Sequence, residues 1–343
     1  MGAANNGVAT QQVDDLVAES LAVRGVPERV HYATGVLLDA QDFAAEQLYT
    51  RARQGRALAA LHGFGTVAGL RVSCPAHDNP EIEVRVLPGV ALDRLGRLVE
   101  VRRTQCIHVA RWLAERAAQA ATAAERVAVT DAVREDVPGE KRLVFDVFLR
   151  FAPCAHGRTP AFAAGPFNAT DYVVPARLAD GFELTLQLAH ATGESESAPK
   201  GTLAVPRPRP PRLEALRREV EQLADPAEHA AAWRLWAQES VLDAWPAASV
   251  EDPGRLPLLA EHAAVADWDK VLLARVSVPV RQDSPTGFPT LDEAAIAAIA
   301  ARTRPAPGEV PEWQRLADQD PRELADNGLR PIVFNPHAWR GAP

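Results

Sequence analysis

The chain has 343 residues, and this length predicts two domains because single domains usually span about 100–200 residues. Its 45 acidic and 37 basic residues are interspersed and give a net charge of −8, which excludes the basic stripe of a nucleic-acid-binding protein. The N-terminus lacks the basic start and apolar core of a secretory signal, and no apolar run approaches the roughly 20 residues of a transmembrane helix. We therefore expect a cytoplasmic protein with no nucleic-acid partner and no direct membrane insertion.

Residues 1–29 predict a polar tail and a short helix, whose apolar face over 13–23 ends before Gly25. The strongest helix signal follows at 39–62. Asp39 is a suitable N-cap, and Asp42 places a negative charge in the first turn. Gly55 is a weak point of this helix because glycine costs about 1 kcal/mol relative to alanine.

Alternating apolar and polar residues predict an antiparallel β-meander after this helix. The segment 90–101 predicts a hairpin with Gly96 in the left-handed position. We expect an Ala-rich helix at 110–135 inserted in the meander, and a loop at 162–176. Together these elements predict an α+β domain over 30–192. Its other expected strands are 66–74, 81–89, 105–109, 141–151 and 181–190.

The remaining chain predicts a Pro-rich linker over 193–211, which favours an extended polyproline II arm, and a helix-rich region over 212–343. Two or three helices are expected within 212–264. The last 40 residues are Pro-rich and irregular, and we expect their end at 332–343 to lie along a neighbour's surface. A strand is expected at 268–280, and a helix at 291–302 capped by Thr290 or Asp292.

Each of the three cysteines has a histidine nearby, which is the nearest approach to a metal-binding signature. Thiolate and imidazole groups are zinc ligands, so a structural zinc site is one interpretation. The preferred interpretation is that the cysteines are small buried hydrophobic residues and that no cofactor is bound, because no turn brings the side chains together. The pairs are Cys74 and His77, Cys106 and His108, and Cys154 and His156.

No catalytic constellation stands out in the sequence. Serine lacks the Gly-x-Ser-x-Gly pattern, and Cys154 with His156 is the only candidate for a thiol-dependent hydrolase. Capping explains Asp39 and Asp42, and turn formation explains Asp93. We therefore expect a protein that is not an enzyme.

The stretch from Gly35 to Val72 combines a helix with a sharp turn into a strand. Polar and aromatic residues share the helix surface, which suits a docking surface or a helix–strand clamp better than a solvated face. The glycines after the helix suit a C-cap and a tight turn. We assign residues of this stretch and of the segments described below to one interaction and structural motif. They are Asp42, Phe43, Glu46, Gln47, Tyr49, Arg56, Gly63, Gly65, Gly69, Asp93, Gly96 and Arg177.

Two patterns in this region resemble a known family. Gly-x-Leu-Leu-x-x-x-Asp-Phe-x-x-Glu-Gln-x-Tyr begins at Gly35, and Leu-x-Gly-x-Gly-x-Val-x-Gly-Leu-x-Val begins at Leu61. A Pro-Gly-x-Ala-x-Asp-x-x-Gly-Arg segment follows from Pro88. The chain is similar over about 30–102 to proteins encoded in gene clusters of phage-tail-like contractile injection systems. A weaker similarity continues at 142–151, around Arg177, and at 268–278.

This resemblance implies a non-enzymatic structural component of such a particle, associated with the baseplate or the attachment of fibres. A cap, adaptor or anchoring role in the same particle is an alternative, as is a carbohydrate- or ligand-binding module. The implied partners are other subunits, with copies of this chain in multiples of three or six, in a particle that is released or docked to a membrane. Many relatives carry cysteines where this chain has Arg94 and Leu95, so the resemblance does not support a metal site here.

Overall fold

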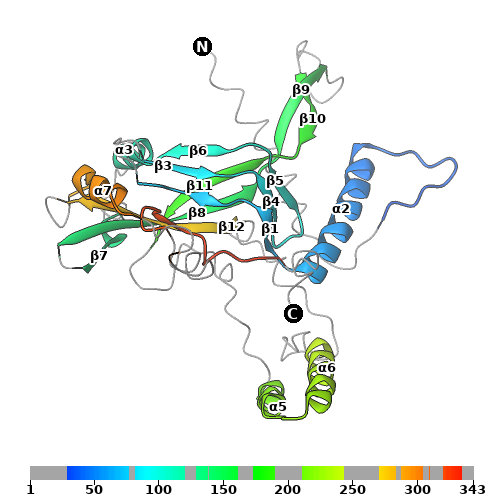
Figure 1. Cartoon of the computed structure of the whole chain (residues 1–343). Coiled ribbons are helices and arrows are strands. Elements are labelled where there is room, and N and C mark those ends of the chain that lie inside the picture. The colour runs from blue at the N-terminus through cyan, green and yellow to red at the C-terminus, as the bar shows by residue number, and fades with distance from the viewer. Residues whose placement is uncertain are drawn as a thin grey trace. The chain divides into compact units, whose positions relative to one another are not determined.

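The computed structural model shows an α+β chain with antiparallel sheets, as the sequence predicts (Figure 1). Residues 1–203 and 264–343 form one compact unit, and 204–263 form a second. The predicted helix at 13–23 and the Pro-rich linker up to residue 210 lie outside the described residues. The structure describes residues 29–76, 82–119, 129–137, 139–160, 173–189, 211–242, 270–282, 287–303, 309 and 320–333.

The largest sheet is built around two long strands, β8 (Glu140–Phe151) and β12 (Lys270–Arg281), which pair antiparallel along most of their length. The strand order is β11–β8–β12–β13, with β7 also on β8 and β14 on β12. A strand from the sequence-predicted region 212–343 therefore lies inside the sheet of the region 30–192, and the described strands of both belong to one unit. The other strands are β7 (Val133–Val137), β11 (Phe182–Leu188), β13 (Thr290–Leu291) and β14 (Ala325–Asp326).

The expected meander forms two three-stranded sheets. One has the order β1–β4–β5, and the other β2–β3–β6. The predicted hairpin at 90–101 corresponds to β4 and β5, which pair antiparallel with Leu92 opposite Leu98. The strands are β1 (Gly65–Gly69), β2 (Val72–Ser73), β3 (Glu83–Val86), β4 (Gly89–Leu92), β5 (Leu98–Val101) and β6 (Gln105–His108).

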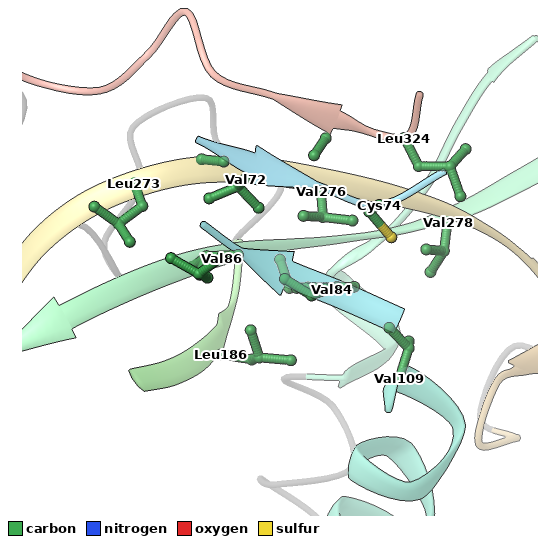
Figure 2. Close-up of a cluster of buried hydrophobic side chains, with 14 of the residues drawn as sticks. Val72, Cys74, Val84, Val86, Val109, Leu186, Leu273, Val276, Val278 and Leu324 are labelled. Atoms are coloured by element: carbon green, nitrogen blue, oxygen red, sulfur yellow. The ribbon is translucent and has the colours of Figure 1, made fainter. Parts of the chain in front are cut away.

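A single hydrophobic core joins these sheets. Alternate residues of β8, from Leu143 to Leu149, point into this core, together with one face of β12. Figure 2 shows Val84 and Val86 of β3 among the core side chains of β12, including Leu273 and Val276. Because burial of each such side chain stabilises the fold by about 1.5–3 kcal/mol, the core holds the separate sheets together.

The helix predicted at 110–135 is wrong for 133–135, while 120–128 lie outside the described residues. Helix α3 (Val109–Gln119) buries Val109 and Leu113, but Val133–Val137 forms strand β7. Val133 lies opposite Leu143 of β8, so pairing with a neighbouring strand outweighs the helix propensity of the surrounding alanines.

Helix α7 (Glu293–Ala300) confirms the expected C-terminal helix and identifies Asp292, rather than Thr290, as its N-cap. The Asp292 carboxylate accepts a hydrogen bond from the Ala295 N–H at 3.1 Å and pairs with Arg281 at 3.1 Å. These contacts lower the pKa of Asp292, with the Arg281 hydrogen bond as the largest cause.

A two-stranded ribbon lies where the sequence suggests loops. Within the described residues, strand β9 (Cys154–Pro160) pairs only with β10 (Val173–Ala179), and Cys154 is the first residue of β9. The prediction of a loop at 162–176 is wrong for 173–176, because these residues belong to β10. Residues 162–172 lie outside the described residues. The residues of β9 and β10 have a weak helix propensity and no clear hydrophobic periodicity. The pairing of these two strands could therefore not be predicted from the sequence.

The second compact unit contains a helical hairpin. Helices α5 (Pro211–Glu221) and α6 (Pro226–Leu242) match two of the helices predicted within 212–264. The Trp236 indole donates to the Leu213 carbonyl at 3.1 Å, and its ring meets Trp233 edge-to-face at 5.2 Å. The hydrogen bond connects the two helices, whereas the ring contact lies within α6.

Candidate interaction surface and its supporting turn

Helix α2 (Ala40–His62) begins with a capping box. The Asp39 carboxylate accepts hydrogen bonds from the N–H groups of Gln41 and Asp42, at 2.8 and 3.1 Å. The Asp42 carboxylate accepts in return from the Asp39 N–H at 2.9 Å. Because this arrangement satisfies N–H groups that a helix start leaves unpaired, it confirms the helix and its predicted start.

Gly55 is the point at which α2 meets the β4–β5 turn. A Cβ on Gly55 would lie 2.6 Å from the Leu95 carbonyl oxygen, and a Cβ on Gly96 would overlap the Gly55 carbonyl. Gly96 also has φ of +76°, as predicted for the hairpin. The backbones can approach this closely only because both residues lack side chains, so Gly55 is a packing site and not merely a weak point of the helix.

Asp93 organises the same turn from inside. Its fully buried carboxylate accepts from the N–H groups of Leu95 and Arg97, at 2.9 and 2.8 Å, and from the Arg97 Nε at 2.6 Å. Burial raises the pKa of Asp93, whereas Arg97 and the backbone donors oppose that rise. Asp93 is therefore a structural residue of the turn, as its position in the sequence predicted.

Two arginines of the turn reach aromatic rings of other elements. The Arg94 guanidinium lies 4.3 Å from the ring centre of Phe64, and that of Arg97 lies 4.7 Å from the ring centre of Phe151. Cation–π contacts of this kind contribute about 0.5–1 kcal/mol each. They connect the turn to the segment after α2 and to β8.

The glycines after α2 are sites of close backbone approach. Gly63 ends the helix, and its N–H donates to the Ala59 carbonyl at 2.9 Å. A Cβ on Gly65 would overlap the Pro331 carbonyl, and one on Gly69 would overlap the Pro88 carbonyl. The predicted C-cap and tight turn are present. Gly65 and Gly69 also allow a second segment of the chain to pack closely against them.

The C-terminal segment 320–333 is the partner that sequence reasoning missed. The Thr66 N–H donates to the Pro331 carbonyl at 2.8 Å, and the Val333 N–H donates to the Thr66 carbonyl at 3.0 Å. The Asn327 amide bonds both backbone groups of Val72 at 2.9 Å. The end at 332–343 is expected to lie along a neighbour's surface; residues 332 and 333 instead lie along their own chain, and 334–343 lie outside the described residues. No local signal in the sequence points to this pairing.

Arg330 strengthens the same attachment. Its Nη1 donates to the Leu70 carbonyl at 2.9 Å, and its Nη2 donates to Asn327 Oδ1. Burial lowers the pKa of Arg330 to about 10, and the nearby Arg71 contributes to that shift.

The cysteine–histidine pairs do not come together as a site. Cys74 is buried, and burial followed by the nearby Glu323 raises the pKa of its thiol. Cys106 and Cys154 are exposed on β6 and β9. His77 lies outside the described residues. Within the described ranges, no group of three or more His, Cys, Asp or Glu side chains is placed to hold a metal ion.

Helix α2 and the residues before it expose a series of large apolar side chains. Leu37 is 95% exposed, Leu61 73% and Phe43 55%, and Tyr32 and Val36 are also exposed. We call these five residues the apolar surface of α2. Such side chains are usually placed inside a fold or an interface, so this surface is the candidate interaction site.

The predicted motif residues divide between this surface and the interior contacts. Gln47 is exposed near Phe43, whereas Glu46, Tyr49 and Arg56 are half-buried. An exposed stripe follows α2 at helical spacing and carries no charge. Its members are Phe43, Gln47, Thr50, Gln54, Ala57 and Leu61.

Arg177 lies away from α2, on β10 directly opposite His156 of β9. The resemblance grouped it with the helix and turn, but in the fold it belongs to the ribbon. Its side chain is exposed.

The chain matches no protein-family model and no curated protein. In the part of the chain that the structure describes, no helix has both the length and the apolar composition needed to cross a membrane.

Proposed function

We propose that this chain is a non-enzymatic structural subunit of a phage-tail-like contractile injection particle, at its baseplate or fibre-attachment end. The observation that carries the proposal is the apolar surface of α2. Leu37 and Phe43 are both positions of the pattern that gives the family resemblance, and both side chains face solvent. An apolar pattern position that the fold does not bury is suited to a contact with another subunit.

The other motif residues support the same proposal in a different way. Gly55, Asp93 and Gly96 hold α2 against the body of the protein through backbone contacts and buried hydrogen bonds. A helix fixed in this way presents its apolar side chains in a defined position, which lowers the entropy cost of binding.

The experiment is a pull-down of the tagged chain from its native host, followed by negative-stain imaging of the recovered material. Sheathed, tail-like particles with the label at one end are expected. A triple variant with Leu37→Ser, Phe43→Ser and Leu61→Ser should fold normally but be recovered without particles. A control with Leu98→Ser and Leu235→Ser, which are similarly exposed elsewhere, should still bring down particles. Recovery of the wild-type chain without any particle would contradict the proposal.

A further inference from the structure

The ribbon of β9 and β10 is an arm rooted in the large sheet. Strand β8 leads into β9 and β10 leads into β11, and β8 also pairs with β11 (Figure 1). At the junction, the Ala152 N–H donates to the Gly181 carbonyl at 3.1 Å. An isolated two-stranded hairpin is only marginally stable, so this continuity with the six-stranded sheet is what supports the ribbon.

Among the described residues, no other strand pairs with the ribbon beyond its root. In the described part of the chain, the pairing of β12 with β8 extends to Arg150, and β9 and β10 pair with each other alone. The described side chains from Cys154 to Thr159, and those of Ala176, Arg177 and Leu178, are exposed. These described side chains of the ribbon are therefore open to a partner.

One face of the ribbon is basic. Residues two apart on a strand share a face, as do directly paired residues of neighbouring strands. His156 lies opposite Arg177, and Arg158 is two residues from His156 on the same face. Neither arginine has an ion-pair partner among the described residues.

The rest of the chain has the opposite charge. The two strands contain Arg158 and Arg177 and no acidic residue, although the residues that connect them include Asp171. Because the whole chain carries −8 and the strands carry +2, the remainder carries −10. The basic face of the ribbon is thus opposite in sign to the net charge of the rest of another copy of the same chain.

We propose that the ribbon is an assembly arm whose basic face, formed by His156, Arg158 and Arg177, docks on carboxylates of a neighbouring copy of this chain. This inference rests on the proposed function, because it specifies how copies of the subunit would contact one another. Edge strands also carry charges that prevent uncontrolled pairing, and either sign of charge serves that purpose. Reversal of the charge would keep the protection against uncontrolled pairing but remove the docking on carboxylates. It therefore distinguishes these two roles.

The test is sedimentation velocity of the purified full chain over a range of concentrations, at about 50 mM and about 500 mM sodium chloride. The wild type should self-associate at low salt and dissociate at high salt. Arg158→Glu with Arg177→Glu should weaken association at least tenfold. The control is Arg102→Glu with Arg111→Glu, two highly exposed arginines elsewhere, which changes the net charge equally and should associate like the wild type.

A second measurement locates the contact. A photoreactive group attached to Cys154, in a Cys106→Ser background, should give cross-linked dimers in the wild-type ribbon and none in the Glu variant. A wild type that is monomeric at every concentration and salt, or an equal loss of association in the control, would overturn the assembly arm. Recovery of particles with a monomeric chain would leave the proposed function intact and reject only this inference.

Discussion

Two antiparallel hairpins of this chain use arginine in opposite ways. In the β4–β5 turn, Arg97 is held by the buried Asp93 and covers the Phe151 ring. In the β9–β10 ribbon, Arg158 and Arg177 are exposed and have no acidic partner among the described residues. The comparison separates a hairpin that stabilises the fold from one whose charges are available to a partner.

Removal of the buried charge should have the largest effect. Asp93→Ala leaves Arg97 without its carboxylate, and loss of one member of a buried pair costs about 3–5 kcal/mol. Arg177→Ala should change the free energy of unfolding by less than about 0.5 kcal/mol, as is usual for exposed positions. Urea unfolding followed by circular dichroism measures both. Equal losses for the two variants would remove the distinction between the hairpins.

Substitution of alanine at two glycines with positive φ tests the same difference between the two hairpins. Gly96→Ala requires α2 to move away from the turn, because the new Cβ overlaps the Gly55 carbonyl, and we expect a loss of about 3 kcal/mol. Gly157→Ala in the ribbon brings its Cβ 3.3 Å from the Ala176 side chain and should cost about 1 kcal/mol. The control is Gly139→Ala, which has positive φ but no heavy atom within 4 Å of its Cβ. Among the three variants, Gly96→Ala should have the lowest midpoint temperature of thermal unfolding.

Loss of the C-terminal attachment should have an intermediate effect. Asn327→Ala removes two hydrogen bonds to Val72 and leaves its backbone groups unpaired, so we expect a loss of about 1–3 kcal/mol. Hydrogen exchange should show faster exchange at Val72 in this variant, while exchange in the ribbon is unchanged. Unaltered protection at Val72 would mean that the segment does not support β2.

The smallest effect concerns α7 and depends on pH. Because the folded protein lowers the pKa of Asp292, its stabilising contribution is present above the ordinary aspartate pKa of about 3.9 and is lost as pH falls through the lower folded value. Asp292→Asn retains a capping side chain without the charge and should flatten this part of the stability–pH curve. Asp292→Ala should cost about 1 kcal/mol near neutral pH. Urea midpoints at about pH 7 and about pH 3 would test both variants.

Local features of the fold could be predicted, whereas long-range pairings could not. Asp39 and Gly96 carry their roles in residue type and position, so the capped helix and the hairpin follow from the sequence. The contact of Gly55 with Gly96 joins residues 41 apart, and that of Gly65 with Pro331 joins residues 266 apart. No periodicity or capping rule encodes such contacts, because they depend on how the whole core packs.

The same limit applies to the candidate site. The sequence predicts that α2 is a docking surface or a clamp; in the structure, Phe43 of this helix is exposed and Gly55 packs against the β4–β5 turn. The position of Arg177 in the ribbon could not be inferred, because strand β9 has neither strong β-propensity nor regular alternation.

The attachment of residues 320–333 to β1 and β2 has a consequence for the synthesis of the protein. The sheet around β8 also needs β12, so a growing chain cannot complete this unit until residue 333 has been made. A ribosome that stalls before this point releases a product with the Thr66 and Val72 backbones unpaired and the core incomplete, a state that proteases and chaperones recognise. Completion of translation thereby becomes a condition for a complete core.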